Sequence, residues 1–102
     1  MNPNIDIKAL QENAQNASKL LKVMANEWRL IILCHLANEE QSVGDLESKL
    51  ELSQSALSQH LAVLRREQLV KTRRDAQSIY YSLDSSDVKA LMRTLYERFC
   101  AS

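Results

Sequence analysis

Short polar and amide side chains come before two arginines in the segment 53–66. Leu57, Leu61 and Leu64 recur at helical spacing, which predicts a helix with one buried side. Gln offers a donor and an acceptor to adenine, Ser bonds to several base edges, and Arg binds phosphates. The exposed side of this helix is therefore predicted to contact DNA through Gln54, Ser55, Ser58, Gln59, His60, Arg65 and Arg66. His60 lies on its flank, where it packs or touches a phosphate.

A second group of basic residues follows. The segments 69–73 and 78–83 are rich in β-branched and aromatic residues that roughly alternate with polar ones, which predicts a hairpin whose turn is 74–77. Arg73, Arg74 and Gln77 extend the predicted DNA contacts onto this hairpin. The formal net charge is +0 overall, but residues 53–82 carry 5 basic and 2 acidic groups. Such a local excess can make a binding face for DNA.

The third set of reactive residues is the pair Cys34 and Cys100. A free cysteine is most often a small buried hydrophobe. A pair in an intracellular protein is also a candidate for redox chemistry, because structural disulfides are rare there. Reactivity needs exposure and a lowered thiol pKa, so the sequence leaves both alternatives open. His35 follows Cys34, but neighbours on a helix diverge, so the two are not predicted to form a catalytic dyad.

Composition bounds the remaining function classes. The 102 residues suit a single domain over 1–102, with 45% hydrophobic and 25% charged residues. The longest apolar run, Leu30 to Cys34, is far too short for a membrane span, and no secretion signal opens the chain, so we expect a cytoplasmic protein. We find no clustered carboxylates, no nucleophile with a base and no cofactor loop. We therefore expect no enzyme and no cofactor.

Four helices are expected before the hairpin and one after it. The first has a narrow apolar stripe suited to packing against another helix, Leu10, Ala14, Ala17, Leu21 and Met24. Asn26 is expected to cap the second, with Leu30, Leu33, Cys34 and Ala37 on one face, and 38–41 to break it. Ser42 and Ser53 are expected to cap the third and fourth, the third burying Val43, Leu46 and Leu50. Ser85 or Ser86 opens the last, whose stripe is Val88, Leu91 or Met92, Leu95 and Phe99.

Two short helices, a longer polar-faced helix and a basic hairpin predict a winged helix-turn-helix. This is a mainly α fold with a small β-hairpin, in the order α-α-α-α-β-β-α. Such a protein reads double-stranded DNA with the second helix of the motif. A helix-turn-helix that binds another protein and leaves DNA alone is the main alternative.

The segments 52–66, 69–70, 80–83 and 21–30 resemble the ArsR/SmtB family of bacterial transcription regulators. This resemblance implies a homodimer built on the first and last helices, and the interface residues expected are Leu10, Ala14, Ala17, Leu21, Leu95 and Phe99. Two positions depart from the family pattern. Gln68 stands where the family usually has glycine, and the tip Asp75-Ala76 where it often has one, so a left-handed backbone at these positions costs up to about 1 kcal/mol.

Many members of this family sense metals, so a metal-sensing repressor is a second alternative. The third helix here carries no thiol, the last carries no His, and zinc needs three or four convergent ligands. We expect no metal site.

The cysteine arrangement and the segment 51–61 resemble the HlyU/BigR/SqrR-like subgroup. That resemblance implies a switch in which oxidants or reactive sulfur species link Cys34 to Cys100, directly or through extra sulfur atoms, and shift the dimer away from its operator. It also implies control of virulence and toxin genes or of sulfur and redox-stress genes. A regulator with inert cysteines remains the other alternative. The operator, the inducer and the sign of regulation are not predicted.

Overall fold

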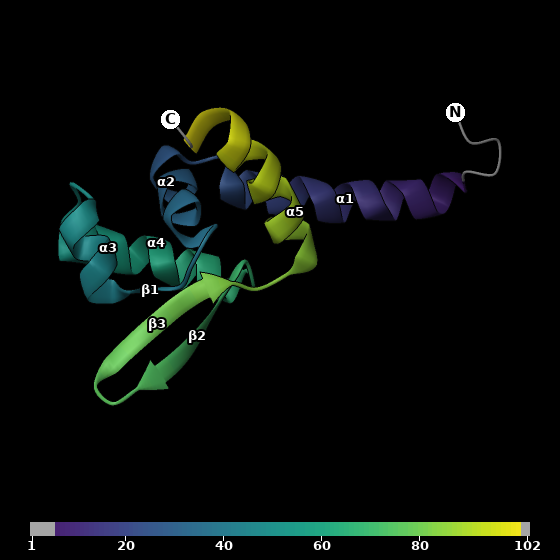
Figure 1. The fold of residues 1–102 in the computed structure, drawn as a ribbon. Helices are drawn as coiled ribbons and strands as arrows, with labels where there is room; N and C mark the ends of the chain where they lie inside the picture. Colours follow the sequence, from purple (N-terminus) through teal and green to yellow (C-terminus); the bar gives the residue numbers. More distant parts are fainter. Residues whose placement is uncertain (1–5, 101–102) are drawn as a thin grey trace.

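Five α-helices lie to one side of a small antiparallel sheet, and the hairpin of that sheet projects away from them (Figure 1). The structure is a computed structural model that describes residues 6–100, with the exception of the side chain of Cys100. Its elements are α1 (Ile7–Met24), α2 (Glu27–Leu36), β1 (Gln41–Ser42), α3 (Val43–Lys49), α4 (Gln54–Arg66), β2 (Val70–Asp75), β3 (Ser78–Leu83), α5 (Ser86–Leu95) and the π-helix η1 (Tyr96–Cys100). This is the predicted winged helix-turn-helix, with two additions, β1 and η1. None of the helices in residues 6–100 could cross a membrane.

Side-chain caps begin four helices where the sequence predicts them. Asn26, Ser42, Ser53 and Ser85 each accept a hydrogen bond from the backbone N–H three residues later. At α3 the bond is reciprocal, because Asp45 also accepts from the backbone N–H of Ser42 at 3.0 Å. The helix-turn-helix therefore has defined starting points for both of its helices.

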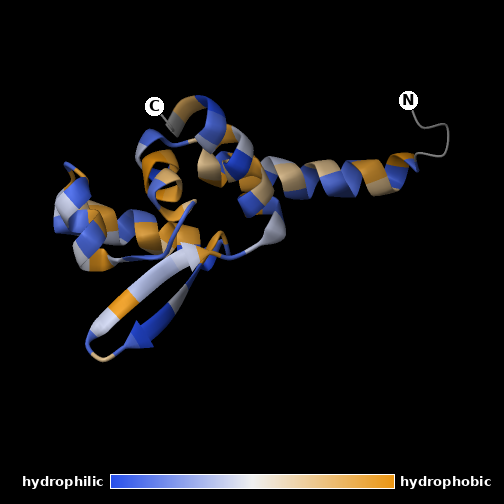
Figure 2. Ribbon diagram, in the orientation of Figure 1, coloured by the Kyte–Doolittle hydropathy of each residue, from blue (hydrophilic) through white to orange (hydrophobic). Residues whose placement is uncertain are grey.

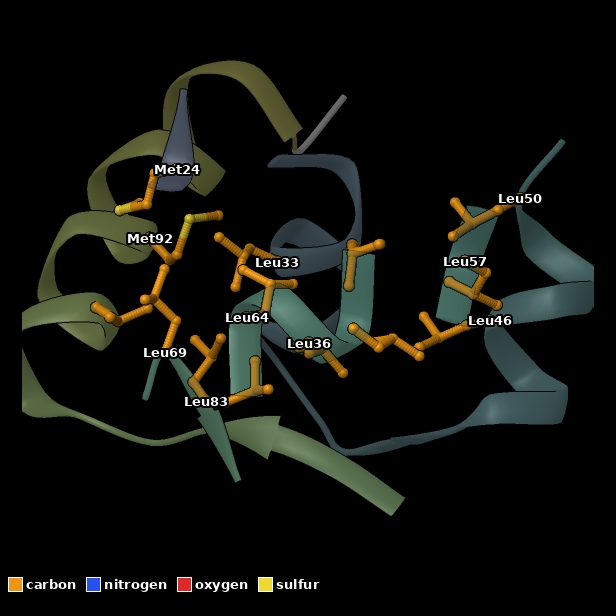
Figure 3. Packing of buried hydrophobic residues seen from close by; sticks show 14 residues of the cluster. Met24, Leu33, Leu36, Leu46, Leu50, Leu57, Leu64, Leu69, Leu83 and Met92 are labelled. Atoms are coloured by element: carbon orange, nitrogen blue, oxygen red, sulfur yellow. The ribbon is translucent and has the colours of Figure 1, made fainter. Parts of the chain in front are cut away.

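The core runs between α2, α4, the sheet and α5. Met24 and Met92 lie at one end of it, and Leu46, Leu50 and Leu57 at the other (Figure 3). The predicted inward face of α4 is confirmed, since its three leucines are at most 2% exposed. Burying one large aliphatic side chain stabilises a fold by about 1.5–3 kcal/mol, so this face holds α4 firmly in place.

The apolar faces expected on α2 and on the last helix each combine buried residues with less buried ones. In α2, Ile32, Leu33 and Leu36 are the fully buried residues, whereas Leu30, Cys34 and Ala37 are only half-buried. α2 is apolar on most of its circumference, so periodicity could not select the face. In α5, Val88 and Met92 face the core. The rest of the predicted stripe faces outward or lies at the edge: Leu91, Leu95 and Phe99.

The sheet has three strands in the order β1-β3-β2, one more than the predicted hairpin. β1 pairs antiparallel with β3, Gln41 opposite Tyr81 and Ser42 opposite Tyr80. The sequence predicts only a helix break at Gln41. A two-residue strand has too few residues to show alternation, and only the edge of β3 makes it a strand. β1 connects α2 to α3 and fixes both to the wing.

Two residues without glycine's freedom adopt positive φ, at the two positions where the family has glycine. Gln68 has φ 66° and follows α4, where its N–H donates to the carbonyl of Arg65 and that of Leu69 donates to Leu64. This pair of bonds is a Schellman motif. Ala76 has φ 55° in the two-residue turn between β2 and β3, whose closing pair is Asp75 and Ser78.

Candidate nucleic-acid interface

α4 presents its polar residues away from the core. Since its leucines point inward, the opposite face leaves four predicted base-reading residues exposed, Gln54, Ser55, Ser58 and Gln59. His60 is half-buried on the flank, as its position next to Leu61 requires. Arg65 and Arg66 are exposed in the last turn. The arrangement has hydrogen-bonding groups early in the helix and charges late in it.

A groove lies between α4 and the sheet. Its volume is about 490 Å³, and Ser58, Arg65 and Arg66 line it together with Tyr81 of β3. The structure thus brings part of the predicted reading face and the wing to one side of the molecule. Tyr81 also packs against the core, so it forms the floor between the two.

The wing carries the second basic group. Arg73, Arg74 and Gln77 are exposed on β2 and the turn, and β2 is the most hydrophilic strand of the hairpin (Figure 2). Arg74 makes no ion pair among residues 6–100, so its charge faces solvent.

Arg73 is held within the protein. Its Nε donates to Glu40 Oε2 at 2.8 Å, a second guanidinium nitrogen donates to Oε1 of the same carboxylate, and its Cζ lies 4.5 Å from the centre of the Tyr80 ring. The hydrogen bonds from Arg73 lower the pKa of Glu40, and those to Glu40 raise the pKa of Arg73. Glu40 was not a predicted site residue, because nothing in the sequence relates it to a strand 33 positions away.

Cys34 lies half-buried on α2 and is disulfide-bonded, so it carries no free thiol. The side chain of Cys100, the other cysteine of the chain, lies outside the described part of the structure. Cys34 lines a cavity of about 480 Å³ whose wall includes Tyr96 and Phe99 of η1. The last turns of the chain therefore lie beside the cysteine of α2.

Polar groups complete that cavity. Gln41 is 3% exposed, and its amide bridges Lys49 and Glu39: Lys49 Nζ donates to Gln41 Oε1 at 2.7 Å, and Gln41 Nε2 donates to Glu39 Oε1 at 3.2 Å. His35 is also in the lining, and burial together with the nearby Lys49 ammonium lowers the pKa of its imidazole. Glu39, Gln41 and Lys49 belong to no sequence motif, so the sequence gives no signal that they share a site.

Apolar side chains are also exposed on α1 and on the last helix, which consists of α5 and the η1 turn that continues it. Leu10 and Leu21 on α1 are 51% and 52% exposed, Leu91 is 37% and Phe99 is 79% exposed. The N-terminal part of α1 extends beyond the other elements (Figure 1). Of the expected interface residues, Ala14 and Ala17 are exposed and Leu95 is half-buried. Within residues 6–100, no group of three or more His, Cys, Asp or Glu side chains could hold a metal ion.

Comparison with protein families matches residues 26–72 to the profile described as "Bacterial regulatory protein, arsR family". The chain is 53% identical over 96 residues to the transcriptional activator HlyU of Vibrio cholerae, an alignment that covers 94% of this chain and 89% of the relative. It is 43% identical over 97 residues to the biofilm growth-associated repressor of Agrobacterium fabrum, covering 95% and 83%.

Solved structures agree with these relatives. Reduced HlyU from Vibrio cholerae has a TM-score of 0.88 at 54% identity, covering 92% of this chain and 99% of that one. The repressor BigR from Xylella fastidiosa has a TM-score of 0.87 at 36% identity, covering 94% and 95%. These proteins are regulators of transcription and not enzymes.

Proposed function

The chain belongs to the arsR family of bacterial regulatory proteins and is a transcriptional regulator, and from this premise we propose that it is a homodimer whose affinity for operator DNA depends on the redox state of Cys34 and Cys100. Membership of the family implies DNA binding. The oligomeric state, the contacting residues and the switch are the proposal. We place the protein in the cytoplasm, at the nucleoid.

The exposed face of α4 is the observation that carries the proposed DNA contacts. Gln54, Ser55, Ser58 and Gln59 would face base edges in the major groove, and His60 would flank them. Arg65 and Arg66 at the end of α4, and Arg74 and Gln77 on the wing, would contact phosphates. Arg73 joins them if it leaves Glu40. The groove between α4 and β3 supports this orientation, because a DNA backbone that runs across it meets both elements.

The exposed apolar residues of α1 and the last helix support the proposed dimer. Leu10 and Leu21 cover no core of their own, and a projecting helix with an apolar stripe is typical of an interface between helices. With both elements in one interface, the distance between the two α4 helices depends on how the last helix sits. Two α4 helices about 34 Å apart would enter successive major grooves.

The place of Cys34 supports the proposed switch. It lies on α2 next to η1, and its disulfide-bonded state is compatible with a link to Cys100. A link between α2 and the end of the chain would hold the last helix against α2. Breaking it would let the last helix, and with it the dimer interface, take another position. A coupling of about 1–3 kcal/mol between these states would change operator affinity about 5- to 150-fold.

The names of the relatives guide our proposal for the genes that this protein controls. One relative is called a transcriptional activator and another a biofilm growth-associated repressor, so the sign of regulation is not transferred. We propose genes of virulence and toxin production or of sulfur and redox stress as targets.

The test is operator binding by protein of defined thiol state. A duplex selected from a random library by the reduced protein would be titrated with reduced and with oxidised protein, over a range of salt concentrations. Mass spectrometry of the same samples would identify the Cys34–Cys100 link. C34A and C100A are the matched variants that cannot form it.

We expect the two redox states to differ at least about fivefold in affinity, and both variants to bind equally with or without oxidant. Equal binding by reduced and linked protein would leave a DNA-binding regulator with inert cysteines. Binding that does not weaken as salt rises would overturn the DNA-binding role itself, because phosphate contacts always depend on salt.

A further inference from the structure

The cavity beside Cys34 combines a disulfide-bonded cysteine with two opposite charges. Lys49 and Glu39 both line it, at the ends of a single amide group. Its volume of about 480 Å³ lies within the range of small-molecule sites, about 300–1,000 Å³.

The buried amide of Gln41 keeps these two charges apart. Because its oxygen faces Lys49 and its nitrogen faces Glu39, the ammonium and the carboxylate each bond to the amide, and they form no ion pair with each other. The Lys49 ammonium has three donors, of which one is used by Gln41. Oε2 of Glu39 accepts no hydrogen bond within residues 6–100. Both charges therefore keep capacity for a ligand.

The backbone of Gln41 is also fixed, since β1 pairs it with Tyr81. Lys49 is the last residue of α3, and Glu39 lies in the short turn between α2 and β1, two residues before the paired Gln41, so both charges adjoin elements that the sheet holds. A ligand with one ammonium and one carboxylate on the same carbon matches this arrangement, with its carboxylate on Lys49 and its ammonium on Glu39. An α-amino acid head group has that chemistry.

We propose that this cavity binds a low-molecular-weight thiol that carries an α-amino acid head group, and directs its sulfur to Cys34. The inference rests on the proposed thiol switch and names the small molecule that exchanges with it. Ile31, Tyr96 and Phe99 supply the apolar part of the wall. Phe99 is 79% exposed, so its ring has surface for both this cavity and the proposed dimer interface.

The exchange is balanced as follows. The thiolate of the small thiol attacks Sγ of Cys34, the disulfide bond of Cys34 breaks, and its electron pair leaves on the partner sulfur, that of Cys100 in the proposed pairing, which takes up a proton. The product is a mixed disulfide between Cys34 and the small thiol. A second thiolate then attacks the small molecule's sulfur, which releases the Cys34 thiolate and a small disulfide. Two small thiols are oxidised and the protein disulfide is reduced, and the reverse sequence oxidises the protein.

The experiment measures reduction of the oxidised full-length protein by four thiols: L-cysteine with both charges, cysteamine with the ammonium, 3-mercaptopropionate with the carboxylate, and 2-mercaptoethanol with neither. Each rate is expressed per thiolate and divided by that thiol's rate with a small reference disulfide, which removes differences in intrinsic reactivity. Mass spectrometry locates the mixed disulfide. L-serine, which has the head group and no thiol, serves as a competitor.

We expect the normalised rate of L-cysteine to exceed that of 2-mercaptoethanol by about tenfold, which is the effect of two partly exposed ion pairs together. L-serine should slow the reduction by L-cysteine. K49Q should lower the rates of L-cysteine and 3-mercaptopropionate and spare cysteamine. E39Q should lower the rates of L-cysteine and cysteamine and spare 3-mercaptopropionate. K22Q removes a lysine of α1 that does not line this cavity, so it should change none of these rates. Lys49 and Glu39 are exposed, and circular dichroism would verify that their variants fold.

Equal normalised rates for the four thiols, or a K49Q profile like that of K22Q, would overturn the inference. These rates are measured without DNA. Charge-selective exchange in a protein whose operator binding ignores its redox state would therefore contradict the switch alone, and a redox-dependent operator affinity without selectivity would contradict the cavity alone.

Discussion

The guanidinium of Arg73 and the carboxylate of Glu40 are joined by hydrogen bonds from two nitrogens, and this pair ties the wing to the segment between α2 and β1. A phosphate that contacts Arg73 must compete with that carboxylate. We predict that E40Q raises operator affinity by up to about fivefold, the range of one exposed ion pair. Titration of labelled operator at fixed salt would measure it. Weaker binding by E40Q would mean that Glu40 serves to hold the wing in its binding position.

The contribution of Arg73 itself can be separated by salt dependence. R73A should bind more weakly, and the slope of log affinity against log salt should become shallower by about one. R74A should behave in the same way. R93A removes an arginine of α5, outside the proposed DNA face, and should keep the original slope. Unchanged slopes for both wing variants would exclude them from phosphate contact.

A single carboxylate introduced on the apolar stripe of α1 tests the proposed dimer interface. L21E should weaken self-association by at least about tenfold, because a carboxylate would be buried in an apolar interface. Analytical ultracentrifugation would measure this change, and operator affinity should fall with it. K22E places the same carboxylate on the next residue of α1, which points about 100° away, and should leave the dimer intact. An L21E protein that sediments like the original would remove α1 from the interface.

Gln68 offers a test of backbone strain. Glycine adopts positive φ without the steric cost that a side chain meets there, so Q68G should raise the free energy of unfolding by up to about 1 kcal/mol. Urea denaturation monitored by circular dichroism would measure it. Q77G, at a residue of the same protein without positive φ, should not stabilise. Destabilisation by Q68G would show that the Gln68 side chain contributes more than the strain it causes.

The lowered pKa of His35 predicts that the free energy of unfolding changes with pH. Burial and the Lys49 ammonium lower the pKa of His35 in the folded protein, so the unfolded chain binds its proton more readily. The contribution of His35 to stability is therefore complete above the unfolded pKa of about 6.5, and it is lost as the pH falls toward the folded value. Glu39, Lys49 and Tyr96 line the same cavity. Denaturation series from pH 7.5 to pH 5 should show a smaller fall for H35Q than for the original protein, and equal falls would contradict the assignment.

The sequence predicted those parts of the fold that local rules determine. Ser42 and Ser53 were identified as caps because a hydroxyl before a helix accepts a free N–H, and the inward face of α4 followed from its leucine spacing. The buried side of α2 could not be predicted from the sequence, because residues 30–34 are all apolar and the side that is buried depends on what packs against them. Whether Leu91 or Met92 enters the core was likewise settled by tertiary packing, in favour of Met92.

The residues of the proposed DNA interface and of the Cys34 cavity also differ in whether the sequence alone could identify them. The polar face of α4 and the wing arginines could be identified because their types match their chemistry. Glu40, Gln41 and Lys49 could not, because they meet their partners only after β1 joins the sheet and α2 and α3 are brought together. Isolated Glu, Gln and Lys residues in a sequence are ordinary surface residues until the fold gives them neighbours.

Ser42 ends β1 and caps α3, so a single residue joins the sheet to the helix-turn-helix. The wing and α4 consequently have little freedom to swing independently when they meet a duplex. Each subunit therefore tolerates few changes in the distance between the base edges that α4 contacts and the phosphates that the wing contacts, so a duplex with an altered groove width should bind more weakly.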